Sequence, residues 1–193
     1  MNVVIIDYGA GNTKSVQFAL GRLGVEAQLS SDVERIKMAD KVIFPGVGHA
    51  ATAMSKLVET GIDQLIPSLH MPVLGICLGM QLMCEYSYEG DTQGLGIFKG
   101  KVQAFDSSLK VPQIGWNAIS KLRSPLFKEV EEASYIYMVH SYYAPLSEQT
   151  IGVCEYGIPY SAALAHKNFY GTQFHPEKRS SVGAQILKNF LAL

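Results

Sequence analysis

Along the first half of the chain, short apolar runs alternate with segments in which hydrophobic and polar residues recur at helical spacing. Short, fully apolar runs are typical of strands buried on both faces of a parallel sheet, and amphipathic segments between them predict helices. The predicted strands cover residues 3–6, 26–29, 41–44 and 73–76, and the predicted helices cover 13–23, 32–39, 50–60 and a short segment reaching 69. Strands and helices alternating at this spacing predict a doubly wound, mostly parallel α/β sheet. Ligands of such sheets bind beyond the carboxyl ends of the strands.

The second half has a different pattern. Short β-like runs separated by polar or Gly/Pro turns cover residues 101–104, 116–120, 134–138, 151–155, 161–165 and 170–174. They predict additional antiparallel strands joined to the sheet, and a last helix over 181–193 closes the fold. Because no repeat, linker or low-complexity tract interrupts the pattern, we expect residues 1–193 to form a single domain.

Composition narrows the function classes. The 193 residues are 48% hydrophobic and 17% charged, with a net charge of -1. This balance fits an enzyme and excludes the basic stripe of a nucleic-acid-binding protein or a polybasic membrane contact. No apolar run approaches the roughly 18 residues of a membrane-spanning helix, and the first residues lack a basic leader. The three cysteines form no CxxC pair, so we expect cytoplasmic thiols, with no disulfide framework, metal site or cofactor.

One cysteine stands in a distinctive setting. The run 72–76 leads into Gly75-Ile76-Cys77-Leu78-Gly79, and a helix-compatible segment follows at once. This is the pattern of a nucleophile elbow, in which glycines allow a sharp strand-to-helix turn that presents the central side chain. The positive end of the helix dipole favours the thiolate. The alternative is a buried structural cysteine beside a tight turn. Cys84, seven residues after Cys77 on the same predicted helix, is expected in the core, and Cys154 in a strand.

A cysteine nucleophile needs a base, and the base needs an orienting acceptor. His175 ends a predicted strand, Pro176 fixes the turn, and Glu177 follows two residues after the histidine. His140 also lies where a strand meets a loop, whereas solvated surface positions are expected for His49, His70 and His166. The sequence therefore offers a Cys77–His175–Glu177 triad, against the alternative that His175 is a plain surface histidine.

Acyl transfer also needs hydrogen-bond donors for the developing oxyanion. The N–H of Leu78, directly after Cys77, is one candidate donor. A neighbouring loop, Pro45-Gly46-Val47-Gly48, has the glycines needed to turn a second N–H inward, although a simple strand-to-helix turn explains these glycines equally well.

These motifs together resemble a known family. Gly75-Ile76-Cys77-Leu78-Gly79-Met80-Gln81 and Phe174-His175-Pro176-Glu177 are similar to the class I (triad) glutamine amidotransferases. Within that family, the resemblance to the glutaminase subunits of imidazole glycerol phosphate synthases runs through the whole chain. It rests on four segments: Pro45-Gly46-Val47-Gly48, Pro112-Gln113-Ile114-Gly115-Trp116-Asn117, Val139-His140-Ser141-Tyr142 and His175-Pro176-Glu177-Lys178.

The resemblance implies roles for individual residues. Cys77 would form a γ-glutamyl thioester from glutamine, His175 would move the proton, and Glu177 would orient His175. Val47 would supply the second oxyanion N–H after a peptide flip. The implied substrate contacts, besides Val47 and Leu78, are Gln81 and Glu89 at the amino-acid end, and Gly48, His140, Ser141 and Tyr142.

The resemblance also implies a partner, a separate (β/α)₈ cyclase that uses the ammonia in histidine biosynthesis. The implied positions near that interface are Asn12, Gln113, Trp116 and Lys178; a tryptophan after a glycine is otherwise more often a core residue. Thr13, His49 and Arg179 depart from the usual pattern of these subunits, and Arg179 lies beside the expected interface. Three alternatives remain: a paralogue feeding another synthase, such as one aminating a nucleotide-linked sugar, a freestanding cysteine hydrolase, and a catalytically silent docking subunit.

Overall fold

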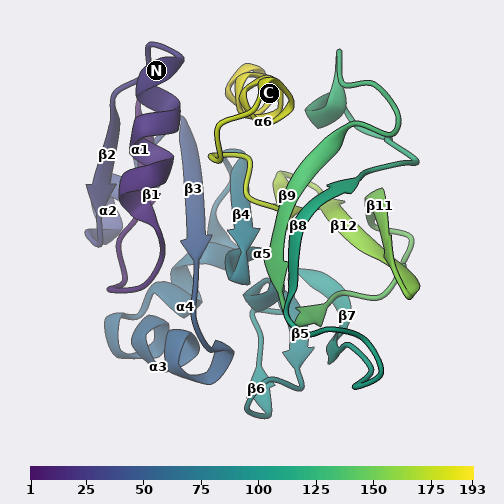
Figure 1. The fold of residues 1–193 in the computed structure, drawn as a ribbon. Helices are drawn as coiled ribbons and strands as arrows, with labels where there is room; N and C mark the ends of the chain where they lie inside the picture. Colours follow the sequence, from purple (N-terminus) through teal and green to yellow (C-terminus); the bar gives the residue numbers. More distant parts are fainter.

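A seven-stranded sheet forms the centre of the structure, a computed structural model that describes residues 1–193 (Figure 1). Its strands are β1 (Val3–Ile6), β2 (Ala27–Ser30), β3 (Lys41–Gly46), β4 (Val73–Cys77), β11 (Thr150–Tyr156), β12 (Ile158–His166) and β13 (Phe169–Thr172). Their order is β11-β12-β13-β4-β3-β1-β2. The strands from β13 to β2 pair in parallel, and β12 and β11 extend that edge antiparallel. The doubly wound, mostly parallel sheet predicted from the sequence is confirmed.

Helices cover both faces of this sheet. They are α1 (Thr13–Arg22), α2 (Val33–Lys37), α3 (Ala50–Thr60), α4 (Ile62–Leu65), α5 (Leu78–Leu82) and α6 (Ser181–Ala192), with 3₁₀ turns η1 (Ile66–Ser68) and η2 (Pro125–Phe127). Alternate side chains of β1 enter different cores. Val4 and Ile6 pack in the cluster with α2, α3 and α4, whereas Val3 and Ile5 pack in the cluster with α1 and α6. Because both faces are buried, each such side chain contributes about 1.5–3 kcal/mol through loss of apolar surface from water.

Polar side chains fix where several helices begin. The side chains of Asn12, Asp32 and Ser180 accept hydrogen bonds from the N–H groups of Ser15, Arg35 and Gly183. Such caps satisfy N–H groups that have no partner within the helix. The predicted starts of α1, α2 and α6 are therefore confirmed.

The second half differs in part from the sequence expectation. Four strands, β5 (Cys84–Ser87), β6 (Thr92–Gln93), β7 (Phe98–Ala104) and β10 (Tyr142–Tyr143), form a separate sheet, and β8 (Gln113–Ala118) and β9 (Tyr135–His140) form a two-stranded ribbon. Only β11 and β12 join the main sheet as antiparallel strands, and β13 is parallel to β4. The six predicted runs all contain strands, whereas β5, β6 and β10 were not predicted. Pairing depends on partners distant along the chain, which the pattern does not specify.

The helix after Cys77 is shorter than expected. The sequence interpretation placed Cys84 on that helix, but α5 ends at Leu82 and Cys84 begins β5. The carbonyl of Met83 accepts hydrogen bonds from the N–H groups of Ile97 and Phe98, so pairing with the β7 segment ends the helix after little more than one turn. Cys84 is nevertheless buried, as predicted for a core residue.

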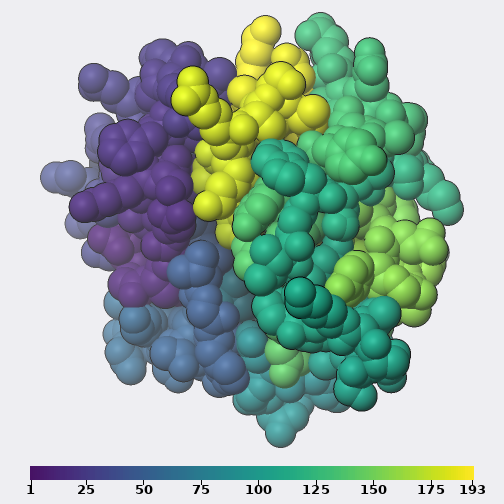
Figure 2. Space-filling view, viewed as in Figure 1, coloured from purple at the N-terminus to yellow at the C-terminus, as the bar shows by residue number.

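The strand order places three functional segments side by side. Cys77 is the last residue of β4, which lies between β3 and β13. Gly46 of β3 is the register partner of Cys77, and Thr172 of β13 pairs with Ile76. The loop after β3 and the segment after β13 therefore begin on either side of the cysteine. On the face shown in Figure 2, α6 lies between α1 and the β8–β9 ribbon.

Candidate active site

The turn at Cys77 has the geometry of a nucleophile elbow. Cys77 has φ 55° and ψ -111°, a conformation that costs a residue other than glycine about 1–3 kcal/mol and that clusters at functional sites. The flanking glycines allow close packing. A Cβ on Gly79 would collide with the Phe44 carbonyl, and one on Gly75 would lie 2.5 Å from the Met83 sulfur. The predicted strand–turn–helix arrangement is confirmed, and the cysteine lies 8% exposed at its tip.

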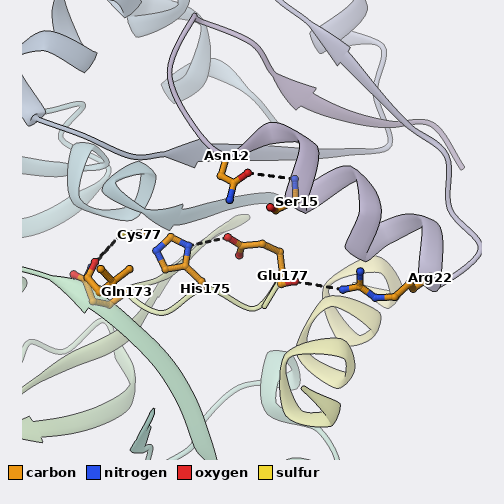
Figure 3. A network of polar contacts seen from close by, with 8 residues as sticks. Asn12, Ser15, Arg22, Cys77, Gln173, His175 and Glu177 are labelled. Atoms are coloured by element: carbon orange, nitrogen blue, oxygen red, sulfur yellow. Dashed lines mark hydrogen bonds and ion pairs between the residues drawn. The ribbon is translucent and has the colours of Figure 1, made fainter. Parts of the chain in front are cut away.

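His175 is held beside the elbow by backbone contacts. Its N–H donates to the Tyr137 carbonyl of β9 at 3.2 Å, and its carbonyl accepts from the Lys178 N–H at 3.1 Å. The imidazole Nδ1 lies 2.7 Å from Oε1 of Glu177, which is buried. Figure 3 shows the resulting row, with Cys77 on one side of the imidazole and Glu177 on the other. Because the carboxylate accepts from Nδ1–H, it fixes the tautomer and leaves Nε2 as the nitrogen that faces the cysteine.

The charge environment favours a protonated His175. Its Nε2 is buried with no hydrogen-bond partner. Burial alone would lower the pKa of His175, but Cys77 and the Glu177 carboxylate together outweigh it and raise that pKa to about 10. A buried imidazolium between two acidic groups is stable only while they carry negative charge. The pair is therefore suited to a thiolate–imidazolium state.

The loop after β3 presents unused backbone donors. The N–H groups of Val47 and Gly48 donate no hydrogen bond within the protein, and Gly48 has φ 95°, a conformation that favours glycine. The Tyr8 hydroxyl donates to the Pro45 carbonyl at 3.0 Å, which holds the end of β3 in place. Leu78 follows the cysteine directly and begins α5. Val47 and Leu78 thus directly follow the ends of two neighbouring strands, β3 and β4.

A cavity of about 400 Å³ joins these groups. This is within the range of small-molecule sites. Every residue that the sequence analysis assigned to substrate binding lines it together with Cys77 and His175: Val47, Gly48, Leu78, Gln81, Glu89, His140, Ser141 and Tyr142. Residues from five separate parts of the chain therefore form one site.

Two of the lining side chains are also tied into the fold. One carboxylate oxygen of Glu89 accepts from the N–H of Ala50 at 2.8 Å, at the start of α3. The amide nitrogen of Gln81 donates to the Tyr142 carbonyl and to Oε1 of Gln173, each at 2.8 Å. These contacts leave one oxygen of each side chain without a partner in the fold.

His140 serves a different role from His175. Its Nδ1 lies 2.7 Å from the Tyr142 carbonyl, and its Nε2 lies 3.3 Å from the Tyr160 hydroxyl. Burial lowers its pKa to about 4, with a further contribution from the charge of His175, although the Tyr142 carbonyl acts in the opposite direction. His140 is therefore neutral near pH 7, and its Nδ1–H donates to Tyr142.

Three contacts of the site were missed from the sequence. Gln173 places its amide nitrogen 3.7 Å from the Cys77 sulfur, Tyr160 contacts His140, and Arg22 donates to the Glu177 carbonyl at 3.3 Å. For Gln173 a signal was present: it lies two residues before His175, and alternate residues of an extended chain share a face. Tyr160 and Arg22 gave no signal, because their proximity arises from distant segments.

The four positions expected near a partner differ in exposure. Asn12 and Lys178 are exposed and line the cavity, and Trp116 is 48% exposed with its ring edge-to-face against Tyr137. The Lys178 ammonium lies 5.5 Å from the centre of the Tyr137 ring. Gln113 is the exception, since it is 1% exposed and its Oε1 accepts from the Tyr160 hydroxyl. In this structure Gln113 lies behind the surface rather than on it.

The remaining histidines and cysteines take the expected places. His49, His70 and His166 are exposed, and Cys154 is a buried residue of β11. No three His, Cys, Asp or Glu side chains converge as a metal site. None of the helices has the length and apolar character required to cross a bilayer.

Comparisons with known proteins agree with this geometry. Residues 4–193 match the family model described as glutamine amidotransferase class-I. The chain is 55% identical over 196 residues to the imidazole glycerol phosphate synthase subunit HisH of Bacteroides fragilis, with all of both chains covered. It is 45% identical over 192 residues to the HisH subunit of Pasteurella multocida, covering 98% of this chain and 97% of that one.

Solved structures agree in fold. A crystal structure described as a glutamine amidotransferase matches with a TM-score of 0.77 at 18% identity, covering 99% of this chain and 98% of that one. The structure of PurLQS from Thermotoga maritima matches with a TM-score of 0.74 at 18% identity, covering 99% and 97%. With a nucleophile elbow, a family model that spans nearly the whole chain and relatives at about half identity, the chain belongs to the class I glutamine amidotransferase family.

Proposed function

We propose that this protein is the glutaminase subunit of an imidazole glycerol phosphate synthase. It hydrolyses glutamine to glutamate and ammonia and passes the ammonia to a (β/α)₈ cyclase. The cyclase makes imidazole glycerol phosphate and an aminoimidazole carboxamide ribotide in histidine biosynthesis. Relatives named as this subunit, 45–55% identical over essentially the whole chain, support the pathway.

The single observation that carries the chemistry is the order of the three side chains. Glu177 engages Nδ1 of His175 at 2.7 Å, and Nε2 is left without a partner in the cavity that also contains Cys77. In this arrangement the thiolate attacks the side-chain carbonyl carbon of glutamine, and the oxygen gains negative charge. The N–H of Leu78 stabilises that oxyanion, and a second donor comes from Val47 once its peptide turns toward the sulfur.

His175 moves a proton in both halves of the reaction, the formation of the thioester and its hydrolysis. The imidazolium gives its Nε2 proton to the leaving nitrogen, ammonia departs, and a γ-glutamyl thioester remains on Cys77. Neutral His175 then takes a proton from water as the water attacks the thioester. Glutamate leaves, and the thiolate and imidazolium are restored. Glu177 stays ionised throughout and holds the ring in register.

The polar groups of the cavity suit the amino-acid end of glutamine. Glu89 contributes negative charge for the substrate ammonium, and the unpartnered Oε1 of Gln81 is a second acceptor. Gly48 and the segment formed by His140, Ser141 and Tyr142 complete the walls. Because these groups complement the amino-acid end of the substrate, we assign them to glutamine binding.

The partner surface follows from exposure around the cavity mouth. Asn12 and Lys178 line the cavity. The exposed Trp116 packs against Tyr137, whose ring the Lys178 ammonium also approaches, and large aromatic side chains supply much of the energy of interfaces. Arg179, exposed next to Lys178, adds a second positive charge to the same edge. Gln113 supports this surface from behind. We infer that residues 1–193 act as one domain in the cytoplasm and that the working unit is a heterodimer with the cyclase.

Glutaminase activity in the presence of the cyclase tests this function. We expect Cys77→Ala to abolish glutamate release, whereas Cys154→Ala, which changes a thiol outside the cavity, should retain it. Turnover by Cys77→Ala would overturn the thioester mechanism.

Growth of a histidine auxotroph that lacks this subunit tests the pathway. Restored growth supports the assignment. No growth, combined with ammonia delivery to a sugar-aminating synthase, would identify a paralogue. Full turnover by the isolated chain, unchanged by the cyclase, would identify a freestanding hydrolase, and an intact fold without thioester formation on a glutamine analogue would identify a docking subunit.

A further inference from the structure

We propose that Gln173 is a hydrogen-bond donor to the Cys77 sulfur and that Gln81, through its contact with the Tyr142 carbonyl, fixes its orientation. This inference deepens the proposed function, on which it rests, because it adds a residue that acts on the reacting atom.

Gln173 lies beside Cys77, where the neighbouring strands β13 and β4 end. It follows β13, which pairs in parallel with β4 up to Thr172 and Ile76, so the next residue on each strand is Gln173 and Cys77. Its N–H donates to the Ala162 carbonyl of β12 at 2.8 Å, which fixes the backbone. The side chain is 0% exposed, and its Nε2 lies 3.7 Å from the cysteine sulfur. Figure 3 shows the two side chains next to each other, beyond the imidazole from Glu177.

The direction of the Gln173 amide follows from its neighbours. A backbone carbonyl only accepts, so the atom of Gln81 that lies 2.8 Å from the Tyr142 oxygen must be the nitrogen. The second hydrogen of that nitrogen points to Gln173, 2.8 Å away, so the facing atom of Gln173 must be its oxygen. The nitrogen of Gln173 is then the atom that faces the sulfur. A flipped Gln173 would place two nitrogens together and an oxygen against a thiolate.

The Tyr142 carbonyl that begins this series is itself fixed. It accepts from Gln81 and from Nδ1 of His140, at 2.8 Å and 2.7 Å, which uses both of its lone pairs. His140 donates because it is neutral and its Nδ1 faces an acceptor. Rotation of the Gln81 amide would leave the Tyr142 carbonyl and Oε1 of Gln173 without this donor, so these contacts hold both glutamine side chains in one orientation.

A donor at this position matters for the charge of the sulfur. The thiolate is negative before attack and again after glutamate leaves, and it is neutral in the thioester. A hydrogen bond to a charged group is stronger than one to a neutral group. The Gln173 N–H therefore stabilises the attacking and leaving form of Cys77 relative to the thiol, and it holds the sulfur on the side of the cavity opposite to the Val47 loop.

The pH dependence of Cys77 alkylation by iodoacetamide, measured by peptide mass spectrometry on the full chain with its cyclase, tests the proposal. Gln173→Leu removes the donor at similar size. We expect the midpoint of alkylation to rise by about one pH unit, and the rate at a pH below both midpoints to fall about tenfold. Gln173→Glu, which keeps the shape but replaces the donor by an oxygen, should raise the midpoint at least as far.

Thr172→Val is the matched control. Thr172 is the preceding residue, it is equally buried, and its hydroxyl has no hydrogen-bond partner. We expect its alkylation midpoint to equal that of the unmodified protein. Equal midpoints for Gln173→Leu, Gln173→Glu and Thr172→Val would overturn the proposal, and circular dichroism identifies any variant that fails to fold. If one glutamine variant does not fold, the other decides.

Gln81→Met tests the relay. It removes both donated hydrogen bonds, so the Gln173 amide loses its orienting partner, and we expect the midpoint to rise by a smaller amount. An unchanged midpoint would remove the relay from the proposal. Iodoacetamide needs neither glutamine nor ammonia transfer, so a failure here leaves the proposed function intact, and a failure of histidine complementation leaves this measurement interpretable.

Discussion

Gly46 at the end of β3 and Gly79 in the first turn of α5 lie backbone against backbone. A Cβ on Gly46 would lie 2.5 Å from the Gly79 nitrogen and 2.9 Å from the Leu78 carbonyl carbon. Gly46 is also the register partner of Cys77. The close approach brings the Val47 loop and Leu78 to the wall of one cavity, so this contact sets the spacing between the two proposed oxyanion donors.

Gly46→Ala should therefore disturb stability and activity together. Relief of the overlap requires a backbone shift, and such overpacking costs about 1–3 kcal/mol. We expect a lower free energy of unfolding in urea and lower glutaminase activity with the cyclase. Gly21→Ala, in α1 where nothing lies within 4 Å of the added Cβ, should leave activity unchanged and stability equal or higher. Equal behaviour of the two variants would contradict the close approach.

Glu177→Gln should preserve the shape of the triad but not its charge. The neutral amide cannot stabilise the imidazolium, so we expect glutaminase kcat to fall by about 10²- to 10⁴-fold with little change in the fold. In titrations followed by NMR, the pKa of His175 should fall from its raised value of about 10. An unchanged His175 titration would show that Glu177 does not control the base.

The raised pKa of His175 also predicts a loss of stability at alkaline pH. A histidine whose pKa is about 10 in the native state and about 6.5 in the unfolded state contributes stability that is complete below pH 6.5 and disappears as pH rises toward 10. The free energy of unfolding should decline across this window in the unmodified protein, and Cys77→Ala, which removes one of the charges that raise the pKa, should reduce that decline. An identical decline in both proteins would argue against the ion pair.

His140 predicts the opposite dependence at acid pH. Its pKa is about 4 in the native state, so the unfolded chain takes up a proton first as pH falls below about 6.5. Stability is complete above pH 6.5 and is lost toward pH 4, by up to about 3 kcal/mol. His140→Leu should flatten this part of the profile, whereas His166→Asn, at an exposed position, should leave its slope unchanged. Urea unfolding from pH 4 to pH 7 measures the slopes.

Glu89→Gln separates substrate binding from catalysis. The amide oxygen keeps an acceptor for the Ala50 N–H, but the negative charge for the substrate ammonium is lost. We expect KM for glutamine to rise about tenfold or more, with a smaller effect on kcat. Glu85→Gln is the control, because its carboxylate also accepts a backbone N–H, from Gly100, outside the cavity. A fall in kcat at constant KM would place Glu89 outside the binding site.

Structural features that depend on residues close together in the sequence could be predicted. The apolar runs, the starts of α1, α2 and α6, and the turn at Cys77 each follow from interactions within a few residues, and the structure has them where the sequence placed them. His175 and Glu177 could be paired because Glu177 follows only two residues after His175 and the fixed φ of Pro176 between them restricts the backbone. Exposure of Trp116 was likewise expected, but only through the family resemblance.

Other features depend on contacts between distant segments. Cys84 left the predicted helix because the β7 segment pairs with the Met83 carbonyl, and Gln113 turned inward because Tyr160 lies behind it. Strands β8 and β9 pair with each other rather than with the main sheet. None of these partners is near in sequence, and a local pattern carries no information on which distant strand will satisfy a backbone group.

The sequence by itself determined the elbow at Cys77, the closeness of His175 to Glu177 and the doubly wound sheet, because the elbow glycines, the strand ends and the apolar periods act locally. Only the tertiary structure decided which groups surround the Cys77 sulfur. Parallel pairing of β4 with β3 and β13 places the Val47 loop on one side and Gln173 on the other, and burial then requires each polar group there to find a partner. This requirement acts between strands that are distant in sequence, and it directs the amide nitrogen of Gln173 toward the Cys77 sulfur.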